Sequence, residues 1–96
     1  LAALQPVFDP AGSVTAGNSS PMNDGAAAVL MMSRRTADEL KLKPRARVVA
    51  TAVAGTEPYL MGTAPVIAVR KALDRAGLSV RDVGLWELHE SFAVQA

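Results

Sequence analysis

Three short apolar runs along the chain predict β-strands. Residues 26–32 form a run of strand length, although its alanines alone would favour a helix. Residues 47–54 are rich in β-branched side chains, which favour strands, and residues 83–88 include the single Trp. Because the first two runs are almost wholly apolar, they fit strands that are covered on both faces of a sheet.

Capping and spacing patterns predict two helices between these strands and a third after them. Residues 36–41 begin with a Thr-Ala-Asp-Glu capping pattern, although Ser33 is also a possible N-cap. Residues 63–76 begin with a Thr that can cap the helix, carry a Pro in the first turn, and stop before Gly77. Apolar side chains recur in this helix at intervals of three and four, which is typical of one buried face: Val66, Val69, Leu73 and Ala76. A third helix is expected to begin at Glu90.

The order strand, helix, strand, helix, strand, helix is typical of a layered α/β domain with a mostly parallel sheet. Residues 1–23 mix Pro, Gly, Ser and Asn and are expected to be mostly loop, with a tight turn at residues 17–20. Ligands of such sheets gather beyond the carboxyl ends of the strands. The segment at residues 89–92 is therefore the first candidate site, and the loop at residues 59–62 is the second.

Composition and charge exclude several classes of function. The chain has 96 residues, with 10 Lys or Arg against 9 Asp or Glu and no basic block, so nucleic acid is not an expected partner. Its apolar runs are far shorter than the ~20 residues of a membrane-spanning helix. With no Cys and one His, it offers no disulfide, no thiolate nucleophile and no metal site. It begins without a Met and ends within an apolar stretch, so we expect a piece of a larger protein.

His89 is the first candidate for chemistry. An imidazole between a strand and a helix can polarise a carbonyl or order a water molecule. A hydrogen-bonded structural His is the more common case at a strand end, and Glu90 fits a first-turn acid that the helix dipole favours. Met61 and Phe92 fit core filling or the wall of an apolar ligand slot. The basic residues between 41 and 47 fit a solvated surface or a contact with an anion.

Three stretches, taken together and in this order, resemble the thiolase family. They are Gly12–Ser20 followed by Asn23–Ala28, then Met61-Gly62-Thr63-Ala64-Pro65 leading to Arg70–Leu73, then His89-Glu90-Ser91-Phe92-Ala93. The similarity runs from about Pro6 to the last residue. The combination is far more specific than any one stretch.

The resemblance implies a fragment of the thiolase fold, a layered α/β/α arrangement with a mixed, mostly parallel sheet. Residues 1–33 would end the N-terminal thiolase half, with a CoA-contact loop and a buried strand. Residues 34–96 would hold a connecting helix and the start of the C-terminal half. The implied reaction is CoA-dependent cleavage of 3-ketoacyl-CoA, or the reverse Claisen condensation, through an acyl-cysteine intermediate. The family's nucleophilic Cys and its acid–base His and Cys lie outside this chain, in agreement with the absence of Cys.

The resemblance also implies site residues. His89 matches the Asn of the family's Asn-Glu-Ala-Phe motif, which holds a water molecule of the oxyanion hole. His is a variation of thiolases that act on longer or branched acyl chains, and an imidazole N–H can orient a water molecule much as a carboxamide does. The remaining matches concern the substrate: Ser20 contacts the pantetheine arm of coenzyme A, Phe8 and Ala16 line that arm, and Met61 and Phe92 lie beside the acyl group.

Three positions depart from the family's pattern. Pro21 and Ala64 stand where the family has Gly, and Ser91 replaces the Ala of the last motif. Pro fixes φ, and Ala lacks the conformational freedom of Gly, so the loops near the acyl group are expected to differ in shape. The accepted chain length therefore stays open.

Two classes of function follow. The parent protein is a thiolase-type acyltransferase, degradative rather than biosynthetic given His89, and the isolated chain is inactive. Alternatively, the chain is a non-catalytic fragment or part of a thiolase-like protein that binds acyl-CoA without turnover. Coenzyme A is a substrate in the first case, and no cofactor is bound permanently. The family forms dimers or dimers of dimers, and a bacterial parent would be cytoplasmic. We expect the isolated chain to be marginally stable or to associate, because its apolar runs stay uncovered.

Overall fold

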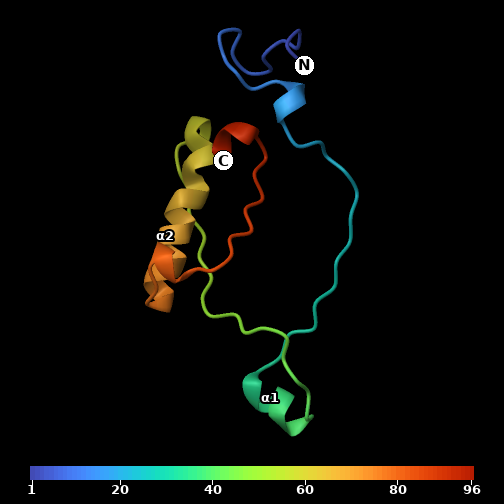
Figure 1. Ribbon diagram of the computed structural model, residues 1–96, viewed down its shortest axis with the longest axis vertical. Helices are drawn as coiled ribbons and strands as arrows, with labels where there is room; N and C mark the ends of the chain where they lie inside the picture. Colours follow the sequence, from blue (N-terminus) through green and yellow to red (C-terminus); the bar gives the residue numbers. More distant parts are fainter.

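Helix α2 (Ala64–Ala76) is the longest element of the computed structural model, which describes residues 1–96. A short helix, α1 (Arg34–Glu39), lies at the far end of the long axis from both chain termini (Figure 1). Four 3₁₀ turns complete the regular structure: η1 (Ala16–Asn18), η2 (Pro58–Thr63), η3 (Val80–Asp82) and η4 (Ala93–Gln95). No helix is both long enough and apolar enough to cross a membrane.

The predicted end of α2 is confirmed. Gly77 follows the helix with a φ of 67°, in the left-handed region. Its N–H donates to the carbonyl of Asp74 at 3.2 Å, and the N–H of Leu78 donates to the carbonyl of Leu73 at 3.0 Å. These bonds satisfy carbonyls that a helix end would otherwise leave without a partner.

Replacing Gly77 by Ala is expected to destabilise the protein by about 1 kcal/mol, because a Cβ at a left-handed position crowds the following carbonyl. Gly84→Ala is the matched control. A Cβ added at either glycine meets nothing within 4 Å, but only Gly77 has a positive φ. Urea denaturation of the full-length protein measures both variants, and equal midpoints would contradict the prediction.

The start of α2 agrees with the prediction in its position but not in its capping bond. Thr63 occupies the N-cap position, but its hydroxyl donates to the carbonyl of Leu60 at 2.8 Å and does not cap the helix. The reason is that η2 runs directly into α2, so the N–H of Ala64 already bonds to the carbonyl of Met61. Ala64 has ordinary helical angles, φ −55° and ψ −37°, so Ala needs no strained backbone here.

Helix α1 starts two residues earlier than the predicted helix 36–41. Ser33 is the N-cap, and its hydroxyl oxygen accepts the N–H of Thr36 at 3.0 Å. Of the two N-caps that the sequence offered, Ser33 is thus confirmed, and Thr36 lies inside the helix. The ion pair between Arg34 and Asp38, at 3.0 Å, is largely exposed and contributes no more than about 0.5 kcal/mol.

The three predicted strands, residues 26–32, 47–54 and 83–88, do not form in this chain. The one strand-like pairing is an isolated antiparallel bridge between Ser19 and Phe92. Residues 26–32 and 47–54 are instead extended traces with no strand beside them (Figure 1). A strand needs a ladder of hydrogen bonds to a neighbour, and these runs have none. The expected sheet was therefore wrong for these residues taken alone.

The extended segment beside α2 keeps the alternating burial of a strand. Ala50, Ala52 and Ala54 are half-buried, while the residues between them are exposed, which is a period of two. The Arg75 guanidinium of α2 donates to the carbonyl of Thr51 at 2.6 Å. One face of this segment is thus turned toward the helix.

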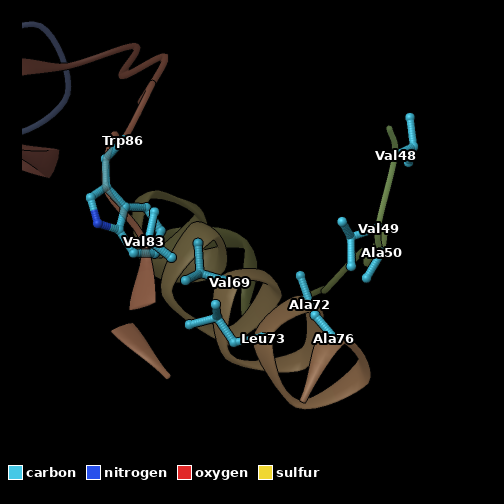
Figure 2. Close-up of a pocket in the computed structure, with 9 residues that line it drawn as sticks. All are labelled: Val48, Val49, Ala50, Val69, Ala72, Leu73, Ala76, Val83 and Trp86. Carbon is cyan, nitrogen blue, oxygen red and sulfur yellow. The ribbon is translucent and has the colours of Figure 1, made fainter. Parts of the chain in front are cut away.

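The apolar face of α2 borders an open apolar hollow of about 250 Å³. The lining side chains come from three segments and are all apolar: Val48, Val49, Ala50, Val69, Ala72, Leu73, Ala76, Val83 and Trp86. Figure 2 shows the residues of 48–50 on one side of the helix and those of 83–86 on the other. The helix face is therefore only partly covered.

The last predicted helix was wrong in its start. Regular structure begins at Ala93 with η4 rather than at Glu90. Phe92, immediately before it, is extended, with φ −135° and ψ 133°. The physical reason is the bridge between Phe92 and Ser19, which holds this backbone in a strand-like conformation that a helix start cannot adopt.

Almost no side chain is buried. Ala37 is the one buried residue, and Met22, Val29 and Leu30 are each more than four-fifths exposed. The radius of gyration is 18.5 Å, whereas a compact domain of this length would have about 12.5 Å. The expectation that the apolar runs stay uncovered is confirmed.

Candidate functional site

The turn at residues 17–20 and the segment at residues 89–92 lie side by side, although they are far apart in sequence. The N–H of Ser20 donates to the carbonyl of Ser91 at 2.8 Å. The Ser20 hydroxyl donates to the carbonyl of Glu90 at 3.0 Å, across 70 residues. Two of the three stretches that the sequence analysis singled out therefore meet in space.

Small polar side chains build the turn at residues 17–20, which was predicted. The Asn18 amide accepts the N–H of Thr15 at 2.8 Å and donates to the carbonyl of Ser13 at 2.9 Å. The Ser19 hydroxyl donates to the carbonyl of Thr15 at 2.7 Å. Such local bonds are why Asn and Ser favour turns. They leave the Ser20 hydroxyl available for Glu90.

An aromatic pair joins the same two regions. The rings of Phe8 and Phe92 meet edge to face, with centroids 5.7 Å apart and an interplanar angle of 85°. Such a pair contributes about 0.5–1.5 kcal/mol beyond its buried area. Phe8 is nevertheless 72% exposed. Most of this ring is therefore open to a ligand.

His89 is exposed and makes no hydrogen bond or ion pair with any other residue of the chain. The structural alternative, a hydrogen-bonded His, is thus not seen among these residues. The adjacent Glu90 is half-buried, and its carbonyl accepts the Ser20 hydroxyl. The imidazole is therefore free to bind a ligand or a water molecule.

The loop that carries Met61 is joined to the last segment by Gln95, a residue that the sequence analysis missed. The Gln95 side-chain amide donates to the carbonyl of Gly62, the neighbour of Met61, at 3.0 Å. Its oxygen accepts the N–H groups of Ser91 and Phe92 at 3.1 and 3.2 Å. A capping-box search would not find Gln95, because the residue three positions before it is Phe rather than Ser or Thr.

A second hollow, of about 340 Å³, lies where the turn meets the last segment. It is lined by residues that supply both polar and apolar surface: Gly17, Asn18, Ser19, Ser20, Pro21, Glu90 and Ala93. Its volume falls at the lower end of the range for small-molecule pockets. Ser20 is the one predicted site residue in this lining, whereas Ala16 lies at the start of the adjacent turn η1 and is exposed. No three His, Asp or Glu side chains converge as a metal site would require.

Residues 1–35 match the thiolase N-terminal domain, and residues 42–96 match the thiolase C-terminal domain. The chain therefore belongs to the thiolase family.

Individual relatives show which members of the family the chain is similar to. The chain is 57% identical, over 96 residues, to a 3-ketoacyl-CoA thiolase of Escherichia coli O139:H28, a match that covers 99% of this chain and 25% of that protein. A crystal structure of the Bacillus anthracis acetyl-CoA acetyltransferase superposes with a TM-score of 0.90 at 47% identity. The human mitochondrial 3-ketoacyl-CoA thiolase in complex with CoA gives 0.90 at 45% identity. Each of these structures matches 98% of this chain and 24% of its own chain, so the present chain spans about a quarter of the length of its relatives.

Proposed function

We propose that the full-length protein that contains this chain is a thiolase-type acyl-CoA C-acyltransferase. It cleaves 3-ketoacyl-CoA with CoA, or runs the reverse Claisen condensation, through an acyl-cysteine intermediate. The observation that carries the proposal is the 57% identity to a 3-ketoacyl-CoA thiolase across the whole chain. The contact between residues 17–20 and residues 89–92, which brings two resembling stretches together, supports it.

The proposal also divides the chain between the two halves of a thiolase. Residues 1–33 end the N-terminal half, and residues 34–96 hold a connecting helix and the start of the C-terminal half. The matches to two successive thiolase domains support this division. In the full-length protein the extended runs would pair with further strands in a layered α/β/α fold. The alternating burial of residues 50–54 supports the strand character of one of them.

His89 is proposed to orient the water molecule that stabilises the thioester oxyanion. An imidazole N–H placed in this way lowers the energy of the charge that develops on the thioester oxygen. The exposure of His89 and its freedom from hydrogen bonds within the chain support this role. Phe92 and Met61 would form the apolar slot beside the acyl group.

Ser20, Phe8 and Ala16 are proposed to contact the pantetheine arm of CoA. The Ser20 hydroxyl donates its one hydrogen to the carbonyl of Glu90. Its oxygen can therefore only accept a further hydrogen bond, and the amide N–H groups of pantetheine are suitable donors. The exposed part of the Phe8 ring offers an apolar surface for the methylene groups of the same arm.

The isolated chain is proposed to be inactive. The acyl-cysteine intermediate needs a thiolate, and the chain contains no Cys. The nucleophile and the acid–base groups would come from the remainder of the full-length protein, which is also proposed to form a homo-oligomer.

The direct test is an assay of the full-length protein for CoA-dependent cleavage of 3-ketoacyl-CoA with short, medium and long acyl chains. Cleavage is expected, together with its loss when the nucleophilic Cys is replaced by Ser. The isolated 96-residue chain is expected to show no turnover. Binding of acyl-CoA without cleavage would instead support the non-catalytic alternative. The absence of both binding and cleavage would overturn the proposal.

A further inference from the structure

The Gln95 side chain is the one hydrogen-bonded connection between the last segment and the loop that precedes α2. Its Nε2 atom donates to the carbonyl of Gly62 at 3.0 Å, across 33 residues. No other hydrogen bond joins residues 83–96 to residues 57–77. Gln95 is therefore the residue through which hydrogen bonding fixes the distance between these two segments.

The amide group of Gln95 fits this place in one orientation. Its Oε1 atom accepts the N–H groups of Ser91 and Phe92, and its Nε2 atom donates to Gly62. The reversed amide would place donors against donors and an acceptor against an acceptor. Gln95, Gly62 and Phe92 are all half-buried, so water competes less for these bonds than at an open surface.

The two segments that Gln95 joins each carry a proposed site residue. Ser91 and Phe92 lie two and three residues after His89, and Gly62 directly follows Met61. We propose that Gln95 is a positioning residue, which holds the His89 segment against the Met61 loop and thereby sets the width of the acyl slot. This inference rests on the proposed thiolase function and extends it to the selection of acyl chain length. Gln95 touches no substrate in this account and acts through the backbone of its neighbours.

Gln95→Glu keeps the hydrogen bonds that the Gln95 side chain accepts and removes the one that it donates. A carboxylate of the same length still accepts the N–H groups of Ser91 and Phe92, so the turn η4 should persist. It cannot donate to the carbonyl of Gly62, and two oxygens would then repel each other. Gln5→Glu is the matched control, because Gln5 is exposed, forms no side-chain hydrogen bond and gains the same charge.

The test measures kcat and KM of the full-length protein on 3-ketoacyl-CoA substrates of short, medium and long chains. We expect Gln95→Glu to lower kcat by about 10-fold, because small displacements of a catalytic group are costly. KM should change little, as when an interaction made only in the transition state is lost. The loss should differ between chain lengths, and Gln5→Glu should behave as wild type. A burst titration of the acyl-enzyme counts the folded sites, so kcat is expressed per site.

A purely structural role would give a different result. Gln95→Glu would then reduce the number of titrated sites or the melting temperature, while kcat per site and the preference among chain lengths stayed at wild-type values; that outcome overturns the inference. If Gln95→Glu does not fold, Gly62→Val replaces it. A Cβ at this position would already be in van der Waals contact with Gln95, 3.4 Å from its Cγ atom, so the two further methyl groups of Val crowd the Gln95 side chain without removing it. The same change in chain-length preference is expected, and its absence overturns the inference.

The wild-type assay separates this inference from the proposed function. A wild-type protein that does not cleave 3-ketoacyl-CoA overturns both. Wild-type cleavage with an unchanged profile for the Gln95 and Gly62 variants overturns the positioning role alone.

Discussion

The 96-residue chain, produced by itself, is expected to unfold in urea without a cooperative transition. Its accessible surface is 8856 Å², whereas a folded protein of this mass exposes about 5,200 Å² and the unfolded chain about 14,500 Å². With one buried residue there is no core whose loss could be cooperative. Circular dichroism during a urea titration would measure the transition.

The same exposed surface predicts association. Apolar side chains of residues 26–32 and of the hollow beside α2 face solvent and should bind a hydrophobic dye or a second copy of the chain. Sedimentation would detect the oligomers, and the full-length protein in the same buffer is the control. A sharp transition of a monomer with no dye binding would contradict this prediction.

Replacing His89 by Ala in the full-length protein is expected to lower kcat by about 10²-fold or more, which is typical of removing one donor from an oxyanion hole. The exposed imidazole, free of hydrogen bonds within the chain, is the proposed donor to the bound water molecule. Steady-state kinetics on 3-ketoacyl-CoA would measure the loss. KM should change little, because the water molecule is used in the transition state.

His89→Asn is the informative comparison for this prediction. A carboxamide N–H can hold the same water molecule, so this variant should keep most of the activity. Ala and Asn variants that lose equal activity would indicate that the volume of the side chain matters rather than its donor. An Ala variant with wild-type kcat would exclude the proposed role of His89.

Local elements of the fold could be predicted from the sequence, and non-local ones could not. The signals that predict helix α2 lie within its own sequence: apolar residues at helical spacing and Gly77 at its end. A strand depends on a neighbour that lies far away in the chain, so residues 26–32 and 47–54 have strand composition without strand structure. The capping bond expected of Thr63 was wrong for a related reason, because η2 had already satisfied the first N–H group of α2.

The candidate site shows the same division. The turn at residues 17–20 was predicted because its Asn and Ser side chains bond to nearby backbone. His89 stood out because it is the single His after an apolar run. Gln95 could not be found, because its importance comes from a carbonyl 33 residues away that no local pattern indicates. The roles of the individual site residues rest on the resemblance and stay predictions.

The contact between Ser20 and Glu90 closes a ring of 70 residues. Closing a flexible ring of that size costs about 4 kcal/mol of chain entropy. The two hydrogen bonds of Ser20 contribute about 1 kcal/mol each, and the Phe8–Phe92 pair contributes about 1 kcal/mol more. These contacts therefore nearly offset the loss of chain entropy. The two sides of the proposed acyl-CoA site would therefore spend much of their time apart if nothing else restrained the ring. In the full-length protein, surrounding structure that shortens this ring would stabilise the assembled site more than a stronger contact between Ser20 and Glu90 would.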